Sequence, residues 1–542
     1  MKIFFFLIIG IISCFGKEYT TRFVIITPSY NNSLYCEKNI HSLIRQQYPH
    51  FRIIYIDDAS TDDTATKISA YINLANEKPP ITFIKNTTRR GALANFYTAI
   101  HTCADDEVIV VVDGDDYLPH PHVLSKLGSV YADPDTWLTY GDFICYPSYQ
   151  QDLKICHPFP DKIVTSNQFR WYPWTSSHLR TFYAGLFKQI KLEDLLYQGE
   201  FFSMAGDVAA MIPMLEMAGK RHRYISDILY VYNTANPISD GYVNRSLQFN
   251  CEYLIRSFAP YHPIDSYIRK PIGETELVVF SFDRPMQLYA LLESAQKYLH
   301  NLEKITVLYR TSSKEYQDGY DLLQKDFRTV YFVKQGAEPH NDFKPLLMSI
   351  LNKTSANYVL FAVDDIIFID HVDIKKCAET LETTNAYGYY LAHSSNLDFC
   401  YMLNMDQGIP PHLTIGQDTY MWQFESGKGD WAYPHSLDFA LYRKGTVINA
   451  LSHLYFSNPN SMEYLWSCAA DLKKYGLFDT SAKAVNIPLN LVNISTNRCM
   501  HSLSAETLLH AFQEGYKIDI DPLFQIPHRS RHMEYEPKFI SR

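Results

Sequence analysis

The sequence predicts an α/β protein made of two tandem domains with mostly parallel sheets. Two observations favour this fold class. Runs that are apolar throughout, such as residues 108–112, alternate with segments of helical spacing, which is typical of parallel strands covered by helices on both faces. The same order then recurs, because 89 residues separate Val24 from Asp113 and 86 separate Val278 from Asp364. A length of 542 residues also fits two domains better than one.

The N-terminal half contains four expected strands and three expected helices up to its main acidic cluster. Apolar and β-branched runs indicate the strands, and apolar residues spaced by three or four positions indicate the helices. The strands are expected at residues 23–27, 53–56, 81–84 and 107–112, and the helices at residues 35–47, 63–74 and 91–103.

The C-terminal half repeats this pattern and sets the expected domain limits. Its strands are expected at residues 277–280, 305–309, 329–333 and 358–363, and its helices at residues 286–299, 318–325 and 343–352. We therefore expect a first domain over residues 20–245 and a second over residues 274–521. A proline-containing linker over residues 246–273 would join them, and residues 522–542 would form a surface tail.

Composition and charge narrow the classes of partner. The chain has 49 basic and 59 acidic residues, a net charge of −10, so we expect no nucleic-acid partner. Its 10 cysteines form no CxxC or other metal-ligand spacing. There is also no P-loop, HExxH, GxSxG or GxGxxG motif that would indicate an NTPase, a zinc protease, an esterase or a dinucleotide enzyme.

The N-terminus resembles a targeting segment. Lys2 is followed by an apolar run over residues 3–15, which is too short for a comfortable membrane span. This pattern predicts a signal peptide over residues 1–16, and the residues before Cys14 resemble a lipobox that would make Cys14 a lipid anchor. We expect an exported or membrane-associated protein, held peripherally or through the lipid; the alternative is a cytoplasmic protein with an apolar extension.

Polar clusters follow each expected strand of the first domain. They are residues 27–32, 57–61, 86–91 and 113–116. Ligands of open α/β sheets bind at the carboxyl ends of the strands, so all four clusters should border one crevice. The Asp-Gly-Asp-Asp sequence at 113–116 offers closely spaced carboxylates, which suit Mg²⁺ or Mn²⁺ and leave positions for a diphosphate.

These motifs resemble the family 2 glycosyltransferases of the GT-A fold. The matching stretches are ITPSYNN, YIDDASTDDT, NTTRRGALANFYTAI and VVVDGDDYL, and the resemblance covers residues 22–240. It implies a Rossmann-like nucleotide-diphospho-sugar transferase fold. It also implies metal-dependent transfer of a hexosyl or N-acetylhexosaminyl group, with inversion, from a UDP- or GDP-sugar. The acceptor would be a glycan, a lipid or a protein.

The resemblance assigns roles to particular residues of this chain. Mn²⁺ or Mg²⁺ would be bound directly by Asp115, with Asp113 reaching the metal or the ribose. The residues expected to bind the donor are Pro28, Tyr30, Asp58, Arg90 and Asp113. Of these, Asp58 would accept a hydrogen bond from the base, and Arg90 would lie near the diphosphate.

Inversion requires a general base on the acceptor side of the sugar. The family uses a carboxylate that opens a helix about a hundred residues after the acidic motif. Here Asp207 precedes an apolar helical segment at residues 208–217, with Gly206 in place of a preceding acid. Asp207 is therefore the candidate catalytic base, although a carboxylate at this position can also serve only as a helix N-cap.

The second half resembles a diverged GT-A-like domain. Its candidate polar residues are Asp283, Asp364 and Asp365, with Arg284 and Asp438 as further candidates, but Asp364-Asp365 lacks the DxD spacing. We leave open whether this domain is a second transferase or a non-catalytic copy that binds an acceptor or supports the structure.

Two alternatives belong to other classes of function. The first is a non-catalytic protein that binds a glycan or a nucleotide sugar on GT-A modules. The second is an iron/2-oxoglutarate oxygenase, because His371-Val372-Asp373 fits its HxD pair. The α/β order argues against the jelly roll that the oxygenase would need.

Overall fold

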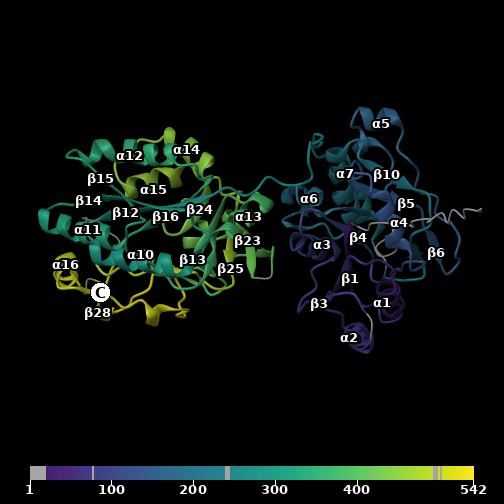
Figure 1. Ribbon diagram of the computed structural model, residues 1–542, viewed down its shortest axis with the longest axis horizontal. Helices are drawn as coiled ribbons and strands as arrows, with labels where there is room; N and C mark the ends of the chain where they lie inside the picture. Colours follow the sequence, from purple (N-terminus) through teal and green to yellow (C-terminus); the bar gives the residue numbers. More distant parts are fainter. Residues whose placement is uncertain (1–19, 76–77, 239–243, 417, 492–497, 501–502) are drawn as a thin grey trace, which may run out of the picture. The chain divides into compact units, whose positions relative to one another are not determined.

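The computed structural model describes residues 20–75, 78–238, 244–416, 418–491, 498–500 and 503–542. The chain separates into two compact units, Met1–Arg269 and Lys270–Arg542, which are described one at a time (Figure 1). The expected signal peptide and Cys14 lie outside the described residues. Within the described part of the chain, none of the helices combines the length and the apolar character that a membrane span requires.

The N-terminal unit is built on a seven-stranded sheet with the order β10-β5-β7-β4-β1-β2-β3. Its strands are β1 (Arg22–Ser29), β2 (Phe51–Asp57), β3 (Ile81–Lys85), β4 (Glu107–Val111), β5 (Leu138–Gly141), β7 (Thr181–Tyr183) and β10 (His222–Ile225). Neighbouring strands are parallel except at β7, which is antiparallel to both β4 and β5. Short pairs outside this sheet are formed by β6 (Ile144–Tyr146) with β11 (Val231–Asn233) and by β8 (Leu196–Tyr197) with β9 (Glu200–Phe201).

Helices cover this sheet because its central strands are buried and apolar on both faces. The helices are α1 (Cys36–Ile44), α2 (Thr64–Leu74), α3 (Ala92–His101), α4 (Val123–Val130), α5 (Asp161–Thr165), α6 (Ala184–Phe187), α7 (Gly206–Ala218) and α9 (Arg245–Ser257), with 3₁₀ turns η1 (Phe169–Trp171) and η2 (Leu192–Leu195). Apolar residues of α1, α2 and α4 pack with β1 and β4 in one buried core. Helix α7 is almost entirely buried, which fits its lack of a polar face.

The C-terminal unit is built on a nine-stranded sheet with the order β15-β14-β12-β16-β24-β19-β25-β23-β22. Its strands are β12 (Thr275–Phe282), β14 (Lys304–Arg310), β15 (Tyr331–Lys334), β16 (Tyr358–Val363), β19 (Gly388–Ser394), β22 (His412–Thr414), β23 (Thr419–Gln423), β24 (Ala440–Arg443) and β25 (Tyr475–Asp479). The short strands are β13 (Leu299–His300), β17 (Ile366–Phe368), β18 (Val372–Asp373), β20 (Phe399–Cys400), β21 (Met405–Asp406), β26 (Ala484–Asn486), β27 (Tyr516–Ile518) and β28 (Phe539–Ser541).

Helices cover this second sheet as well. They are α10 (Pro285–Tyr298), α11 (Lys314–Asp326), α12 (Pro339–Lys353), α13 (Ile374–Thr384), α14 (Lys444–Ser452), α15 (Pro459–Cys468) and α16 (Ala505–Gln513), with 3₁₀ turns η3 (Phe424–Ser426), η4 (Gly429–Ala432) and η5 (Asp521–Leu523). In Figure 1, α12, α14 and α15 lie above the sheet and α10 and α16 lie below it.

The two sheets share one strand order over seven strands. Counted from β3 in the first unit and from β15 in the second, the first four strands are parallel to one another. The fifth strand is antiparallel to both of its neighbours, and the sixth and seventh strands are parallel to each other. Strand β24 corresponds to β7, and β22 and β23 are additions. The expected α/β class with mostly parallel sheets is confirmed.

Two segments differ from the expectation. Residues 246–273 were expected to be a linker, but α9 packs on α7 and belongs to the first unit, because Cys251 and Ile255 are apolar and buried. Residues 522–542 were expected to be a surface tail. Instead, Arg531 and His532 are buried, and β28 pairs with β27.

Candidate functional site

The polar loops that follow the central strands of the first unit are tied together at one edge of the sheet. The backbone N–H of Asp58 donates to the carbonyl of Ser29 at 2.8 Å. The Asn39 amide of α1 donates to the carbonyls of Asp113 at 2.9 Å and Asp116 at 2.7 Å. The loops after β1, β2 and β4 therefore border one another, as the strand-end rule predicts.

Asp58 organises the loop that leads into α3. Its Oδ1 accepts from the Asn86 side chain at 2.8 Å and from the Arg90 backbone N–H at 2.9 Å, and its Oδ2 accepts from the Gly91 N–H at 2.8 Å. Both carboxylate oxygens are thus engaged within the protein. In the structure, Asp58 therefore stabilises the 86–91 loop. A nucleotide base that donates to Asp58 would have to share the carboxylate oxygens with these loop donors.

The neighbouring Asp57 was not singled out from the sequence. Its Oδ2 accepts from the Ser60 N–H at 3.3 Å, whereas its Oδ1 is buried without a hydrogen-bond partner. A buried carboxylate oxygen without a partner is costly unless a ligand supplies the donor. The only signal in the sequence was the pair of adjacent acids at the end of β2.

The other expected donor-binding residues are spread around this edge. Pro28 is buried within β1, opposite Ile56. Tyr30 is half-buried, and the guanidinium carbon of Arg89 lies 4.0 Å from its ring centroid. The side chain of Arg90 donates to Thr98 on α3 at 3.2 Å. Arg89 therefore stacks on Tyr30, and Arg90 packs along α3.

The acidic loop needs a glycine at its second position. A Cβ atom on Gly114 would lie 2.5 Å from the Ser29 side chain, so a larger residue would force the loop away from β1. Asp115 follows, and its Oδ2 accepts from Asn236 at 2.7 Å. Its carbonyl accepts from Asn233 at 3.3 Å. The segment around residues 230–236 thus closes against the acidic loop.

Asp116 is buried and fixes this closure. Its Oδ2 accepts from the Tyr230 hydroxyl at 2.7 Å, and its Oδ1 accepts from the Asn233 N–H at 2.6 Å. Burial, with the nearby charges of Asp115 and Asp113, raises the pKa of the Asp116 carboxyl well above its usual value. Asp116 therefore positions the closing segment as well as contributing to the acidic loop.

The structure gathers a possible set of metal ligands from Asp113, Asp116 and His178. Ligand atoms of these three side chains lie within 4.8 Å of one another. His178 is buried with no partner for Nδ1, it stacks on Tyr230, and burial lowers its pKa well below the usual value. A neutral imidazole beside carboxylates suits a divalent cation. Asp113 belongs to this set. Asp115 lies two residues further along the chain, and its carboxylate accepts a hydrogen bond from the Asn236 side chain.

Asp207 lies at the start of α7 and is bound to an arginine. Its Oδ2 accepts from Arg180 at 3.0 Å, and its Oδ1 is 2.9 Å from the Val208 N–H. Asp207 is not the N-cap, because that position belongs to Ala205. The same guanidinium lies 3.5 Å from the Asp113 carboxylate, so Arg180 connects the candidate base to the acidic loop.

The charge at this edge is mainly negative. Burial raises the pKa of the Asp113 carboxyl to about 6, where Arg180 opposes the shift and Asp115 and Asp207 add to it. From the sequence, Arg180 and His178 were candidates only for a wall of the acceptor site, and no contact with the acidic loop was predicted. They lie on the segment that enters β7, and only the insertion of β7 beside β4 brings them to the acidic loop.

The family model described as Glycosyl transferase family 2 matches residues 24–190, which include β1, β4 and the acidic loop. Residues 24–190 form a glycosyltransferase family 2 domain. The sequence resemblance to this family in the N-terminal half is thereby confirmed. The C-terminal unit lies outside the match.

Similar proteins share this family 2 domain. The bifunctional glycosyltransferase pgtA of Dictyostelium discoideum is 27% identical over 214 residues, covering 35% of this chain and 27% of pgtA. The poly(ribitol-phosphate) beta-N-acetylglucosaminyltransferase TarS of Staphylococcus aureus is 30% identical over 99 residues, covering 18% of this chain and 17% of TarS. A crystal structure of TarS 1-349 in complex with UDP-GlcNAc aligns with a TM-score of 0.34 and 19% identity, covering 43% of this chain and 65% of that structure.

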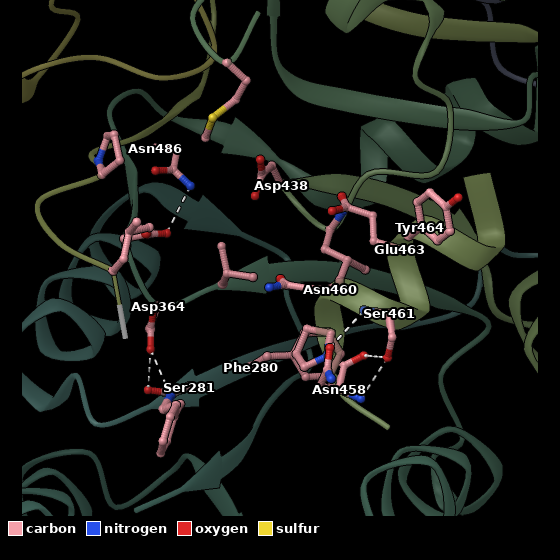
Figure 2. A pocket seen from close by; sticks show the side chains of 18 of the residues that line it. Phe280, Ser281, Asp364, Asp438, Asn458, Asn460, Ser461, Glu463, Tyr464 and Asn486 are labelled. Carbon is pink, nitrogen blue, oxygen red and sulfur yellow. Dashed lines mark hydrogen bonds between the residues drawn. The ribbon is translucent and has the colours of Figure 1, made fainter. Parts of the chain in front are cut away.

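The candidate residues of the C-terminal unit form a different arrangement. Asp283 accepts from the Ser312 N–H at 2.9 Å and stabilises the loop after β14. Asp364 and Asp365 both accept from Arg284, at 2.9 and 3.0 Å. Figure 2 shows Asp364 hydrogen-bonded to Ser281 at the end of β12. Asp364 and Asp365 are thus paired with Arg284 within the protein, and Asp283 does not take part in this ion pair.

Proposed function

We propose that the N-terminal unit is a metal-dependent inverting glycosyltransferase. It would transfer a sugar from a UDP- or GDP-linked donor to a glycan, lipid or protein acceptor. The observation that best supports this function is the connection from Asp207 through Arg180 to Asp113, in which Arg180 and Asp113 lie within the family 2 match. It places a candidate base beside the loop that would hold the leaving diphosphate. The two relatives described above are named as glycosyltransferases, although they match only part of this chain.

The donor side is formed by the strand-end loops. The buried Oδ1 of Asp57 and the loop held by Asp58 would receive the base and ribose. Tyr30, with Arg89 stacked on it, offers a ring and a positive charge beside that loop. Arg90 follows on the same loop and would lie near the diphosphate, although its guanidinium contacts Thr98 in the structure.

The acidic loop suits a divalent cation. Asp113 and Asp115 would hold Mn²⁺ or Mg²⁺, with His178 and Asp116 close to Asp113. The cation would neutralise charge on the departing diphosphate. The fit rests on this chain's own donor set: carboxylates that repel one another and a buried imidazole nitrogen without a partner.

On the acceptor side, Asp207 would take the proton from the attacking hydroxyl. Arg180 fixes the rotamer of Asp207 and places a positive charge beside it. The attacking oxygen forms a bond to the anomeric carbon while the bond to the diphosphate oxygen breaks, which inverts the configuration. A positioned base of this kind contributes about 10²–10⁴-fold to the rate.

The test is a donor screen with the full-length chain. UDP- and GDP-sugars are incubated with Mn²⁺ and an acceptor library, and release of nucleoside diphosphate is measured. We expect release that Asp115→Ala reduces by roughly 10²–10³-fold, while Asp318→Asn, on the exposed face of α11, leaves it unchanged. Absence of release with every donor, or release that Asp115→Ala leaves intact, would contradict the proposal.

A further inference from the structure

The C-terminal unit contains a cavity of about 1180 Å³ that no family match covers. It opens at the carboxyl ends of β12, β14 and β16 and at the start of α15, and Figure 2 shows side chains that line it. The volume exceeds that of most pockets for small ligands, which measure about 300–1,000 Å³. The cavity therefore has room for a ligand of several rings.

The strand register shows which residues of the two units correspond. Ser29 pairs with Asp57 at the end of β1, and Ser281 pairs with Tyr309 at the end of β12. The backbone N–H of Asn86 donates to Asp57, and that of Gln335 donates to Tyr309. Residue 58 of the first unit thus corresponds to residue 310 of the second.

By this register the second unit lacks counterparts of Asp58 and Asp113 and keeps one of the two carboxylates proposed to hold a cation. Arg310 occupies the position of Asp58. Ile26, three residues before Ser29, pairs with Val111. Val278, three residues before Ser281, pairs with Phe361. Counting forward, Val363 occupies the position of Asp113, and Asp365 occupies that of Asp115.

Arg284 fills the space where a cation would otherwise be needed. Its Nη1 lies 2.9 Å from Asp364 Oδ1 and 3.0 Å from Asp365 Oδ2, and its Nε donates to Asn490 at 3.0 Å. Arg284 is buried, so its charge is already matched by two carboxylates inside the protein. The guanidinium thus occupies the space between Asp364 and Asp365, where a divalent cation would otherwise bind.

The opposite wall of the cavity carries the acceptor groups. Helix α15 lies between β24 and β25 in the chain, as α7 lies between the corresponding strands β7 and β10. Asn460 is the second residue of α15 and therefore occupies the position of Asp207, the second residue of α7. One turn further, Glu463 faces the cavity together with Asp438 (Figure 2). Burial and the nearby Asp438 raise the pKa of Glu463 to about 7. A carboxyl group that titrates near neutrality can both donate to and accept from hydroxyl groups.

Buried polar atoms without partners also line this cavity. They are Oδ1 of Asn486, Nε of Arg531 and Nδ1 of His532, on residues that are 6%, 6% and 5% exposed. Such atoms indicate a ligand with hydroxyl or amide groups. The rings of Tyr433 and Tyr464 lie in the same lining and can stack on the C–H face of a sugar.

We propose that the C-terminal unit binds a neutral oligosaccharide in this cavity without a divalent cation. Glu463, Asp438, Asn460 and Asn486 would bind its hydroxyl groups, and Tyr464 would stack on a ring at the rim. A neutral ligand is favoured because the charges that line the cavity nearly balance. The lining holds four arginines and five carboxylates, and the buried Arg284 and Arg531 are paired with acids at 2.9 and 2.8 Å. This binding does not depend on the transferase activity proposed for the N-terminal unit.

The test uses the full-length chain with Asp115→Ala, which removes the proposed cation site of the first unit. The probe is an array of neutral di- to tetrasaccharides of glucose, galactose, mannose, fucose and N-acetylglucosamine, read in EDTA. We expect binding that Glu463→Gln weakens by about tenfold, equivalent to about 1.4 kcal/mol. Asp318→Asn, an exposed acid on α11 outside the cavity, should leave binding unchanged.

A second variant covers the case in which Glu463→Gln impairs folding. Tyr464 is 68% exposed, so Tyr464→Ala should leave the unfolding temperature unchanged and still weaken binding. The proposal is wrong if the Asp115→Ala chain binds no neutral sugar, if binding requires a divalent cation, or if UDP or GDP displaces the sugar. Displacement by a nucleotide would instead indicate a second donor site.

Discussion

At the scale of single residues, the structure shows that Asp207 is not the cap of its helix. Ala205 is the N-cap of α7, and Asp207 accepts from Arg180 at 3.0 Å. The family resemblance assigned the role of base to Asp207 because it opens an apolar helix after the acidic motif. It could not predict Arg180, because the antiparallel pairing of β7 with β4 joins residues distant in the chain and has no local pattern.

Asp207→Asn should lower kcat by about 10²–10⁴-fold, because an amide cannot take the proton of the acceptor hydroxyl. The KM for the donor should stay within about twofold, since Asp207 does not touch the loops proposed to bind it. Steady-state kinetics measure both constants. Asp161→Asn, at the exposed start of α5, is a matched control and should change neither. Normal turnover in Asp207→Asn would remove this residue from the mechanism.

Asp58→Asn should act through the loop rather than through the chemical step. An amide has one acceptor oxygen where the carboxylate has two. It therefore cannot accept all three hydrogen bonds, from the Asn86 side chain and from the backbone N–H groups of Arg90 and Gly91. Leaving one of these donors unpaired costs about 1–3 kcal/mol. We expect a rise of roughly tenfold or more in the donor KM, with kcat at saturation much less affected. An unchanged donor KM would show that the 86–91 loop does not contact the donor.

At the scale of elements, α7 is held in place by a buried ion pair. Arg170, on η1, donates to both carboxylate oxygens of Glu216 at 2.8 and 2.7 Å, and the two side chains are 1% and 0% exposed. The Tyr261 N–H adds a bond to the same carboxylate at 2.9 Å. This pair ties α7 to the chain that precedes β7 and to the segment that follows α9, so it stabilises the helix on which Asp207 lies.

Glu216→Ala should destabilise the N-terminal unit by about 3–5 kcal/mol, because it leaves the Arg170 charge buried and unpaired. The measurement is urea-induced unfolding of the full chain, followed through the transition assigned to this unit. Asp227→Ala is the comparison, since Asp227 forms a pair with Lys126 in which the two side chains are 52% and 44% exposed. That pair should contribute no more than about 1 kcal/mol. Equal effects of the two substitutions would contradict the argument.

At the scale of the whole molecule, the sequence predicted the two sheets from their buried central strands and predicted less well what surrounds them. Strands such as β4 are apolar after their first residue, and the repeated order follows from that pattern. Strands of three or four residues, such as β7 and β24, have no periodicity to detect. The sequence also could not predict that His532 lines the cavity of the C-terminal unit, because this depends on a contact between the end of the chain and the sheet.

The two units also differ in how they balance buried negative charge. In the first, Asp113 and Asp207 share Arg180, and the pKa of Asp113 is raised to about 6, mainly by burial. In the second, Asp364 and Asp365 share Arg284, and the pKa of Asp365 is raised to about 6, also mainly by burial. The difference lies in the geometry, because Arg284 lies 2.9 and 3.0 Å from its two carboxylates, whereas Arg180 lies 3.5 Å from Asp113.

Removing divalent cations should therefore separate the functions proposed for the two units. After dialysis of the full-length chain against EDTA, nucleoside diphosphate release should fall by roughly tenfold or more, and added Mn²⁺ or Mg²⁺ should restore it. Binding of neutral oligosaccharides to the same sample should not change, because Arg284 occupies the position between the two carboxylates. Release that continues in EDTA would show that the acidic loop of the first unit works without a metal. Sugar binding that is lost in EDTA would show that Arg284 does not replace a cation in the second unit.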